Sequence, residues 1–168
     1  MTSLLAGILL LHGGQAITGP KVLVTLGTGK SFTLQLDAKN TPKTSAGIAA
    51  LVKKGFYTGI RIHRVEPGFC VQWGDPLSKN GVDAPGVGSG GTGKNLPFEP
   101  GTLSFKKGVL GMASTAAGAG GDCQMFIALG DVPQLDGKYS AFGKVVKGMD
   151  VVMGIERGVK IVSMKIVK

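Results

Sequence analysis

The chain contains few side chains that could hold a metal ion. Only two cysteines, Cys70 and Cys123, and two histidines, His12 and His63, occur among its 168 residues. Neither cysteine belongs to a C-x-x-C pair, and this supply is too small for a structural zinc site. The cysteines leave one disulfide open as an alternative, but two free thiols on buried strands is the simpler interpretation.

The patterns of common hydrolases are also missing. No G-x-S-x-G segment is present to carry a serine nucleophile on a sharp turn. Acidic residues number 10 and no two of them are adjacent, so paired carboxylates for acid–base chemistry are not indicated. His63 has no evident nucleophile as a partner, and a histidine in an apolar strand is more often structural.

Long apolar runs are absent. Residues 4–11 are apolar but too few to span a bilayer, so no membrane span is expected. Residues 14–16 resemble a small-residue cleavage site, but the positively charged region of a secretory signal is missing. Residues 1–20 are therefore a signal remnant or an apolar segment packed on the domain, and residues 21–168 form one domain. The compartment, cytoplasmic or exported, stays open.

Negative charge is scarce, and the net charge is +9. The basic residues are mostly lysines spread along the chain, and the longest basic runs are the pairs 53–54 and 106–107. Aromatic residues do not alternate with them, as a platform for stacked bases would require. A solvated protein surface is therefore favoured over nucleic-acid binding.

Glycine, in contrast, is abundant, with 29 residues. Many glycines among short apolar runs indicate strands joined by tight turns. Periodicity and turn residues predict strands at 22–26, 31–36, two within 60–73, 110–113, 124–129, 140–146 and 159–167. One helix is predicted from a cap at Thr41, with Pro42 in its first turn, to Gly55, and a second from 148 to near 158. This composition favours a closed antiparallel β-barrel with helices over its ends.

One glycine-rich stretch imitates a nucleotide-binding loop. Residues 88–95 read G-S-G-G-T-G-K-N, close to the pattern G-x-x-x-x-G-K-[ST]. A phosphate loop needs a buried strand before it and a helix start after it. Residues 82–85 do not form such a strand, and Pro100 would fall in the first turns of the helix. Nucleotide hydrolysis is thus a disfavoured alternative.

The most informative stretch is residues 56–76, which read F-Y-T-G-I-R-I-H-R-V-E-P-G-F-C-V-Q-W-G-D-P. It resembles the signature of the cyclophilin family, in which a strand ending in F-H-R-V is followed by P-G-F and then by Q-G-G-D-P. Further blocks are similar to family segments in the same order, at 108–113, 124–127, 135–146 and 148–152. The resemblance runs from about Val22 to the C-terminus.

This resemblance implies a closed eight-stranded antiparallel β-barrel capped by two α-helices. It also implies a peptidyl-prolyl cis-trans isomerase that assists protein folding. Such an enzyme speeds rotation about X–Pro bonds, against a barrier of about 18–20 kcal/mol from amide resonance. No covalent bond forms, and no cofactor is expected.

The resemblance assigns roles to ten residues. Arg64 matches the catalytic arginine, whose rigid fork of donors would favour the twisted amide. Gln72 matches the glutamine that orients this arginine and contacts the substrate backbone. Three apolar residues match the floor that holds the proline ring: Phe69, Phe126 and Leu135. The other matched positions line the peptide groove: Cys70, Ala113, Ser114, Gln124 and Tyr139.

Several positions depart from the family pattern. Trp73 replaces the first glycine of Q-G-G-D-P, and Met125 replaces a phenylalanine, which is interpreted as a core substitution. Gln134 stands where many relatives carry a tryptophan that contacts cyclosporin, so binding of that drug should be weakened. Cys70 makes one wall of the groove smaller than a methionine would.

The expected partners are proline-containing peptides and unfolded protein segments. Nucleic acid is not expected as a partner, and the chain is expected to be a monomer. The main alternative is a module that binds proline peptides without useful turnover.

Overall fold

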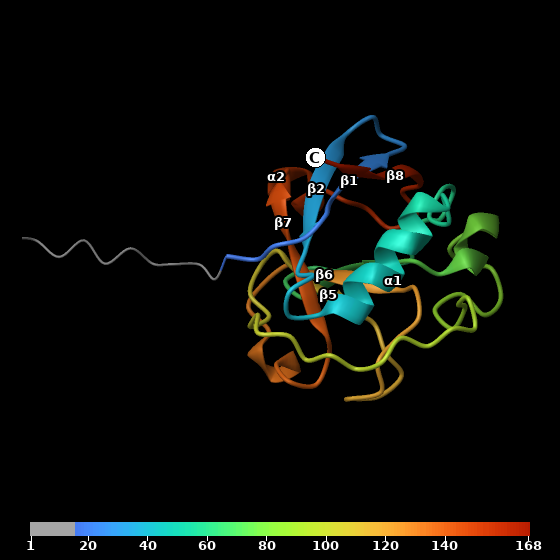
Figure 1. Cartoon of the computed structure of the whole chain (residues 1–168). Helices are drawn as coiled ribbons and strands as arrows, with labels where there is room; N and C mark the ends of the chain where they lie inside the picture. Colours follow the sequence, from blue (N-terminus) through green and yellow to red (C-terminus); the bar gives the residue numbers. More distant parts are fainter. Residues whose placement is uncertain (1–15) are drawn as a thin grey trace, which may run out of the picture.

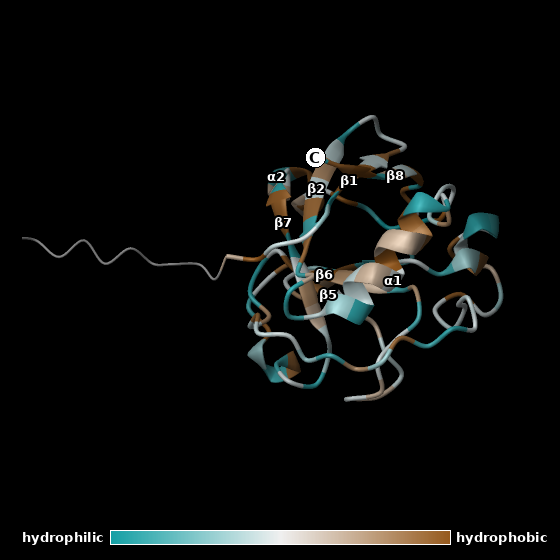
Figure 2. Cartoon of the chain, viewed as in Figure 1, coloured by the Kyte–Doolittle hydropathy of each residue, from teal (hydrophilic) through white to brown (hydrophobic). Residues whose placement is uncertain are grey.

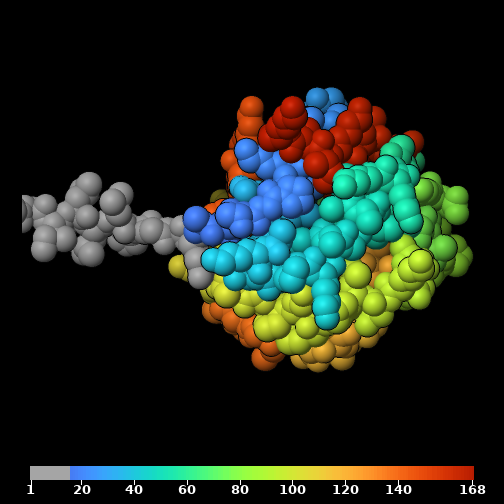
Figure 3. Space-filling view, viewed as in Figure 1, coloured from blue at the N-terminus to red at the C-terminus, as the bar shows by residue number. Residues whose placement is uncertain are grey.

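The computed structural model describes residues 16–168 (Figure 1). The apolar run at 4–11 and the cleavage-site pattern at 14–15 lie outside the described residues. Within the described part, Ile17 is buried, and the backbone of 18–20 bonds to that of 36–38. Figure 3 shows the blue N-terminal residues lying between the red C-terminal strand and the cyan region that contains the first helix.

Eight antiparallel strands form one sheet. In chain order they are β1 Lys21–Leu26, β2 Ser31–Leu36, β3 Arg64–Glu66, β4 Cys70–Trp73, β5 Val109–Met112, β6 Met125–Ala128, β7 Ala141–Lys147 and β8 Ile161–Val167. Their order across the sheet is β3-β4-β6-β5-β7-β2-β1-β8. The mainly β class and most predicted strands are therefore confirmed.

The sheet is open, so the expectation of a closed barrel is wrong. It curls into a half-barrel whose edge strands β3 and β8 do not pair with each other. The chain just before these strands is paired only over a short stretch, with one isolated bridge between Arg61 and Lys160 and backbone hydrogen bonds between residues 59–62 and 158–161. Gly59 and Gly158 turn the chain at the ends of this stretch with φ angles of 83° and 94°. Because both segments turn there, the pairing stops, and β3 and β8 form no continuous ladder.

The larger buried cluster lies between one face of the sheet and α1, and a smaller cluster around Phe105 and Phe126 lies on the opposite face. Alternate residues of β1 and β2 are buried, as expected for strands with one face on the core. Trp73 is fully buried, and its ring meets that of Phe32 edge-on at 6.3 Å. Ile48 and Val52 of helix α1 are buried against this cluster, while Leu51 is half-buried. Figure 2 shows apolar residues on the strands and in the middle of α1.

Two α-helices and two 3-10 helices complete the fold. They are α1 Pro42–Lys53, α2 Met149–Met153, η1 Pro76–Asn80 and η2 Pro133–Leu135. Pro42 occupies the first turn of α1, and Gly55 follows its last residues, as predicted. Helix α2 is shorter than predicted, because it ends at Met153 rather than near 158.

The N-terminal cap of α1 differs from the prediction. The Thr41 hydroxyl donates to the carbonyl of Asp37 at 2.8 Å instead of accepting from the helix. The carboxylate of Glu99 accepts from Lys43 N at 3.2 Å and from Thr44 N at 2.8 Å. A residue from a distant loop therefore caps this helix, which the local sequence could not indicate.

We expect Glu99→Ala to lower the free energy of unfolding by about 1 kcal/mol, because two helix amides lose their charged acceptor. Glu99→Gln keeps an acceptor oxygen and should lose less. Urea unfolding of both variants measures the difference, and Glu156→Ala, at an exposed position, serves as the control. An unchanged midpoint in Glu99→Ala would mean that water caps the helix equally well.

Candidate functional site

A hairpin of β3 and β4 carries the predicted catalytic pair. In its register Arg64 lies opposite Gln72 and Glu66 lies opposite Cys70. Because side chains alternate along a strand, these four residues share one face of the hairpin. The turn after Glu66, which the sequence predicted, joins the two strands.

Three side chains surround the guanidinium of Arg64. Its Nη1 donates to Gln72 Oε1 at 3.2 Å. Its Nε donates to Glu66 Oε1 at 2.7 Å, and its Nη2 lies 2.6 Å from the same oxygen. The guanidinium carbon sits 5.4 Å from the ring centroid of Phe69. The sequence prediction omitted Glu66, although its position two residues after Arg64 on a strand was the available signal.

A cavity of about 270 Å³ opens beside Arg64, and we call it the Arg64 cavity. Nine of the ten predicted site residues line it: Arg64, Phe69, Cys70, Gln72, Ala113, Ser114, Phe126, Leu135 and Tyr139. They come from β3, β4, β6, η2, the turn between β3 and β4, and the loops after β5 and η2. The structure thus brings together residues that are up to 75 positions apart in the sequence, from 64 to 139.

Aromatic packing makes the floor of the Arg64 cavity rigid. The ring of Phe126 stacks on that of Phe105 at 5.5 Å and meets that of Tyr139 edge-on at 6.4 Å. Phe105 is fully buried and supports Phe126 from behind. Cys70 is also buried, and burial raises the pKa of its thiol to about 11. The thiol is therefore neutral near pH 7, and this wall acts as an apolar surface.

A second cavity, of about 540 Å³, adjoins the first and shares Gln72, Ala113 and Ser114 with it. Gln124, the tenth predicted residue, lies here instead of in the Arg64 cavity. Its Oε1 accepts from Gln72 Nε2 at 3.0 Å, and its Nε2 donates to Gly90 O at 2.9 Å. A chain of side-chain hydrogen bonds thus leads from Arg64 through two glutamines to the glycine-rich loop.

Two carboxylates of the chain accept hydrogen bonds from the backbone amides of this loop. Asp75 is fully buried and accepts from the N–H groups of Gly88 and Gly90, at 2.5 and 2.9 Å. Asp122 accepts from Thr92 N and Gly93 N, at 2.7 and 2.8 Å. Amides bonded to internal carboxylates are not free to hold a phosphate, which disfavours the nucleotide-binding alternative further.

The two cysteines are free and buried, so the disulfide alternative is wrong. Burial, with Asp122 as the next contribution, raises the pKa of Cys123 to about 12.

Within residues 16–168 no group of three or more His, Cys, Asp or Glu side chains is arranged to hold a metal ion. No helix in the described part has the length and apolar character needed to cross a membrane.

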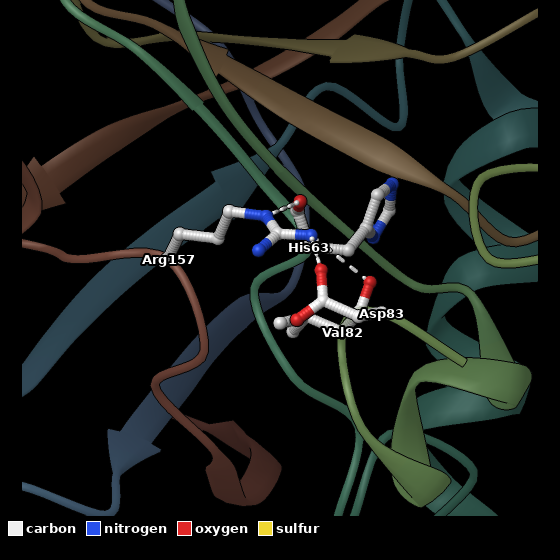
Figure 4. Close-up of polar contacts among 4 residues, drawn as sticks. All are labelled: His63, Val82, Asp83 and Arg157. Atoms are coloured by element: carbon white, nitrogen blue, oxygen red, sulfur yellow. Dashed lines mark hydrogen bonds and ion pairs between the residues drawn. The ribbon is translucent and has the colours of Figure 1, made fainter.

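His63 has a structural environment. It is buried, and desolvation lowers the pKa of its imidazole, although Asp75 opposes this shift. Its backbone carbonyl accepts from Arg157 Nε at 2.9 Å, and Arg157 Nη2 also bonds Val82 O and Asp83 (Figure 4). Figure 4 shows the imidazole pointing away from this arginine. Through these contacts, Arg157 connects the backbone next to Arg64 to the loop after η1.

Of the departures from the family pattern, Cys70 lines the Arg64 cavity, whereas Trp73, Met125 and Gln134 lie outside it. Trp73 points into the core, and Met125 is fully buried, as its interpretation as a core substitution predicted. Gln134 is exposed in η2 and is not among the residues that line either cavity. None of these three side chains therefore narrows the space beside Arg64.

Comparisons with known proteins agree with this geometry. Residues 21–168 match the family model described as cyclophilin type peptidyl-prolyl cis-trans isomerase/CLD. A probable peptidyl-prolyl cis-trans isomerase of Brucella suis is 42% identical over 129 residues, covering 74% of this chain and 66% of that protein. The matched part is thus slightly less than two thirds of that relative's length. Peptidyl-prolyl cis-trans isomerase-like 1 of Aspergillus fumigatus is 39% identical over 127 residues, or 73% of each protein.

Solved structures show the same architecture. The crystal structure of a cyclophilin type isomerase of Cryptosporidium parvum, obtained in the presence of the dipeptide Ala-Pro, is similar with a TM-score of 0.75. The two chains are 26% identical, and the match covers 88% of this chain and 99% of that one. The family match over residues 21–168, the relatives and the fold lead to one conclusion: this chain belongs to the cyclophilin family of peptidyl-prolyl cis-trans isomerases.

Proposed function

We propose that this chain is an active peptidyl-prolyl cis-trans isomerase, with residues 21–168 as its catalytic domain. Its substrates are X–Pro segments in peptides and in unfolded protein chains. The observation that carries the proposal is the position of Arg64, whose guanidinium lies at the rim of a cavity with a stacked aromatic floor. That the similar Cryptosporidium protein was crystallised in the presence of Ala-Pro supports a proline-containing ligand.

The chemistry follows from amide resonance. In the planar states the proline nitrogen shares its lone pair with the carbonyl, and twisting the bond localises that pair on nitrogen. A donor aimed at the nitrogen therefore stabilises the twisted state more than either planar state. Arg64 is suited to this role because it stays charged and holds its donors in a fixed plane. Catalysis then needs no covalent intermediate and no cofactor.

The remaining residues have binding roles in this proposal. Phe69, Phe126 and Leu135 hold the proline ring, with Cys70, Ala113, Ser114 and Tyr139 around it. Gln72 holds Arg64 and contacts the substrate backbone together with Gln124. Because the ring sits on a rigid floor, rotation is confined to the part of the peptide that leaves the cavity. Cyclosporin binding is expected to be weak because Gln134 replaces a tryptophan, and the active unit is proposed to be a monomer.

The test is an isomerisation assay by exchange NMR on a short peptide that contains Ala-Pro. We expect the protein to accelerate exchange in both directions equally, since an isomerase leaves the equilibrium unchanged. A titration of the same peptide measures binding in parallel. Binding without acceleration would reject the enzyme and support the proline-binding module instead. Addition of ATP should change neither result.

A further inference from the structure

Glu66 makes the closest polar contacts of the catalytic arginine. One oxygen of its carboxylate accepts from Arg64 Nε at 2.7 Å and lies 2.6 Å from Nη2. The two residues are neighbours on one face of β3, so the pair needs no distant part of the fold. The side chains are 44% and 49% exposed, and only that of Arg64 lines the Arg64 cavity.

These contacts involve only some of the hydrogens of the guanidinium. An arginine has one hydrogen on Nε and two on each terminal nitrogen, all in one plane. Glu66 takes the edge formed by Nε and Nη2, while Gln72 accepts one hydrogen of Nη1. One hydrogen on each terminal nitrogen remains. These two hydrogens are left for a substrate.

We propose that Glu66 is a positioning residue that fixes the orientation of Arg64. This inference rests on the proposed isomerase function and adds a residue to it. With Glu66 in place, the guanidinium plane is held at two edges, by a carboxylate and by an amide, above the Phe69 ring. Without Glu66, only Gln72 and the ring hold the arginine, and its free end samples orientations that miss the amide nitrogen.

The experiment compares Glu66→Ala and Glu66→Gln with the unmutated protein in the exchange assay. Because the ion pair is half exposed, we expect Glu66→Ala to lower kcat by about fivefold. KM should stay within twofold, since the proline ring is held by the cavity and not by Arg64. Glu66→Gln retains an acceptor oxygen and should recover at least half of the loss. Glu156→Ala removes an exposed carboxylate elsewhere and should leave the rate unchanged.

A second measurement does not depend on activity. The Nε–H signal of Arg64 in a ¹⁵N-correlated NMR spectrum should be sharp in the unmutated protein, because the carboxylate protects that hydrogen from exchange with water. It should broaden in Glu66→Ala. Thermal unfolding of the variants must match the unmutated protein within a few degrees, which separates positioning from folding.

The outcomes distinguish the two proposals. If the unmutated protein does not accelerate exchange, the proposed function fails, while the NMR signal still reports on the ion pair. If the unmutated protein is active and Glu66→Ala is as fast or faster, the positioning role of Glu66 is overturned. The same holds if Glu66→Gln is as slow as Glu66→Ala, because the acceptor oxygen would then not matter.

Discussion

Arg64→Ala is expected to lower kcat/KM for a peptide that contains Ala-Pro by about 10²–10³-fold, the usual effect of removing one preorganised donor from a transition state. The side chain of Arg64 is 44% exposed, so its truncation opens no cavity in the core. The aromatic floor of the Arg64 cavity remains, so the peptide should still bind. The loss should therefore appear in kcat, while the dissociation constant from an NMR titration changes little.

Arg64→Lys is the matched control for this prediction. A lysine keeps the charge but has no planar fork, and it cannot bond Glu66, Gln72 and a substrate nitrogen together in the same way. We expect it to recover only a small part of the rate. A fully active Arg64→Ala variant would mean that another group donates to the proline nitrogen, and the mechanism proposed above would have to be abandoned.

Nine of the ten residues that the resemblance assigned to the site line one cavity, and there is a physical reason for this. These residues lie in short segments whose own pattern carries the information, such as the alternation that places Arg64 and Gln72 on one face of a hairpin. The resemblance to a known family then supplies the fold, and this fold brings the segments together at one cavity. Only Gln124 lies elsewhere, in the adjoining cavity, and it still bonds Gln72.

The errors concern contacts between parts of the chain without such a pattern. The closed barrel was predicted from the many glycine-bounded strands and from the family resemblance, yet turns at Gly59 and Gly158 limit the pairing between the two sheet edges to one bridge and its neighbouring backbone hydrogen bonds. The cap of α1 was assigned to the adjacent Thr41, whereas Glu99 supplies it from 55 residues away. Local sequence patterns cannot indicate either feature, because each depends on where a distant segment lies.

A common principle connects several of these unpredicted contacts. The chain has only 10 acidic residues, and five of them accept hydrogen bonds from backbone amides at least 13 positions away: Asp75, Glu99, Asp122, Asp131 and Asp136. Long loops expose many backbone amides that no strand or helix can satisfy, and a carboxylate accepts several of them at once. The carboxylates therefore hold the loops in place, which agrees with the absence of paired acids for catalysis.

Asp75→Ala should reveal how much one of these carboxylates contributes. Asp75 is fully buried and accepts from Leu77 N, Gly88 N and Gly90 N. Its truncation leaves three amides without the buried carboxylate that accepts from them. We expect the free energy of unfolding to fall by about 3–5 kcal/mol, measured by urea unfolding. Asp83→Ala is the control, because the side chain of Asp83 is 82% exposed and its ion pair with Arg157 should contribute little.

Asp75→Asn distinguishes the hydrogen bonds from the volume of the side chain. It keeps one acceptor oxygen but turns an NH₂ group toward backbone N–H donors, so we expect a smaller but clear loss of stability. Gln124 bonds Asp75 and the carbonyls of Gly88 and Gly90, so either variant should also loosen Gln124. Because Gln124 bonds Gln72, and Gln72 bonds Arg64, the position of Arg64 should become less fixed as well. A variant that stays folded should therefore lose part of its kcat. If Asp75→Ala were as stable as the unmutated protein, the glycine-rich loop would have to find other acceptors, and the view of the carboxylates as loop anchors would be wrong.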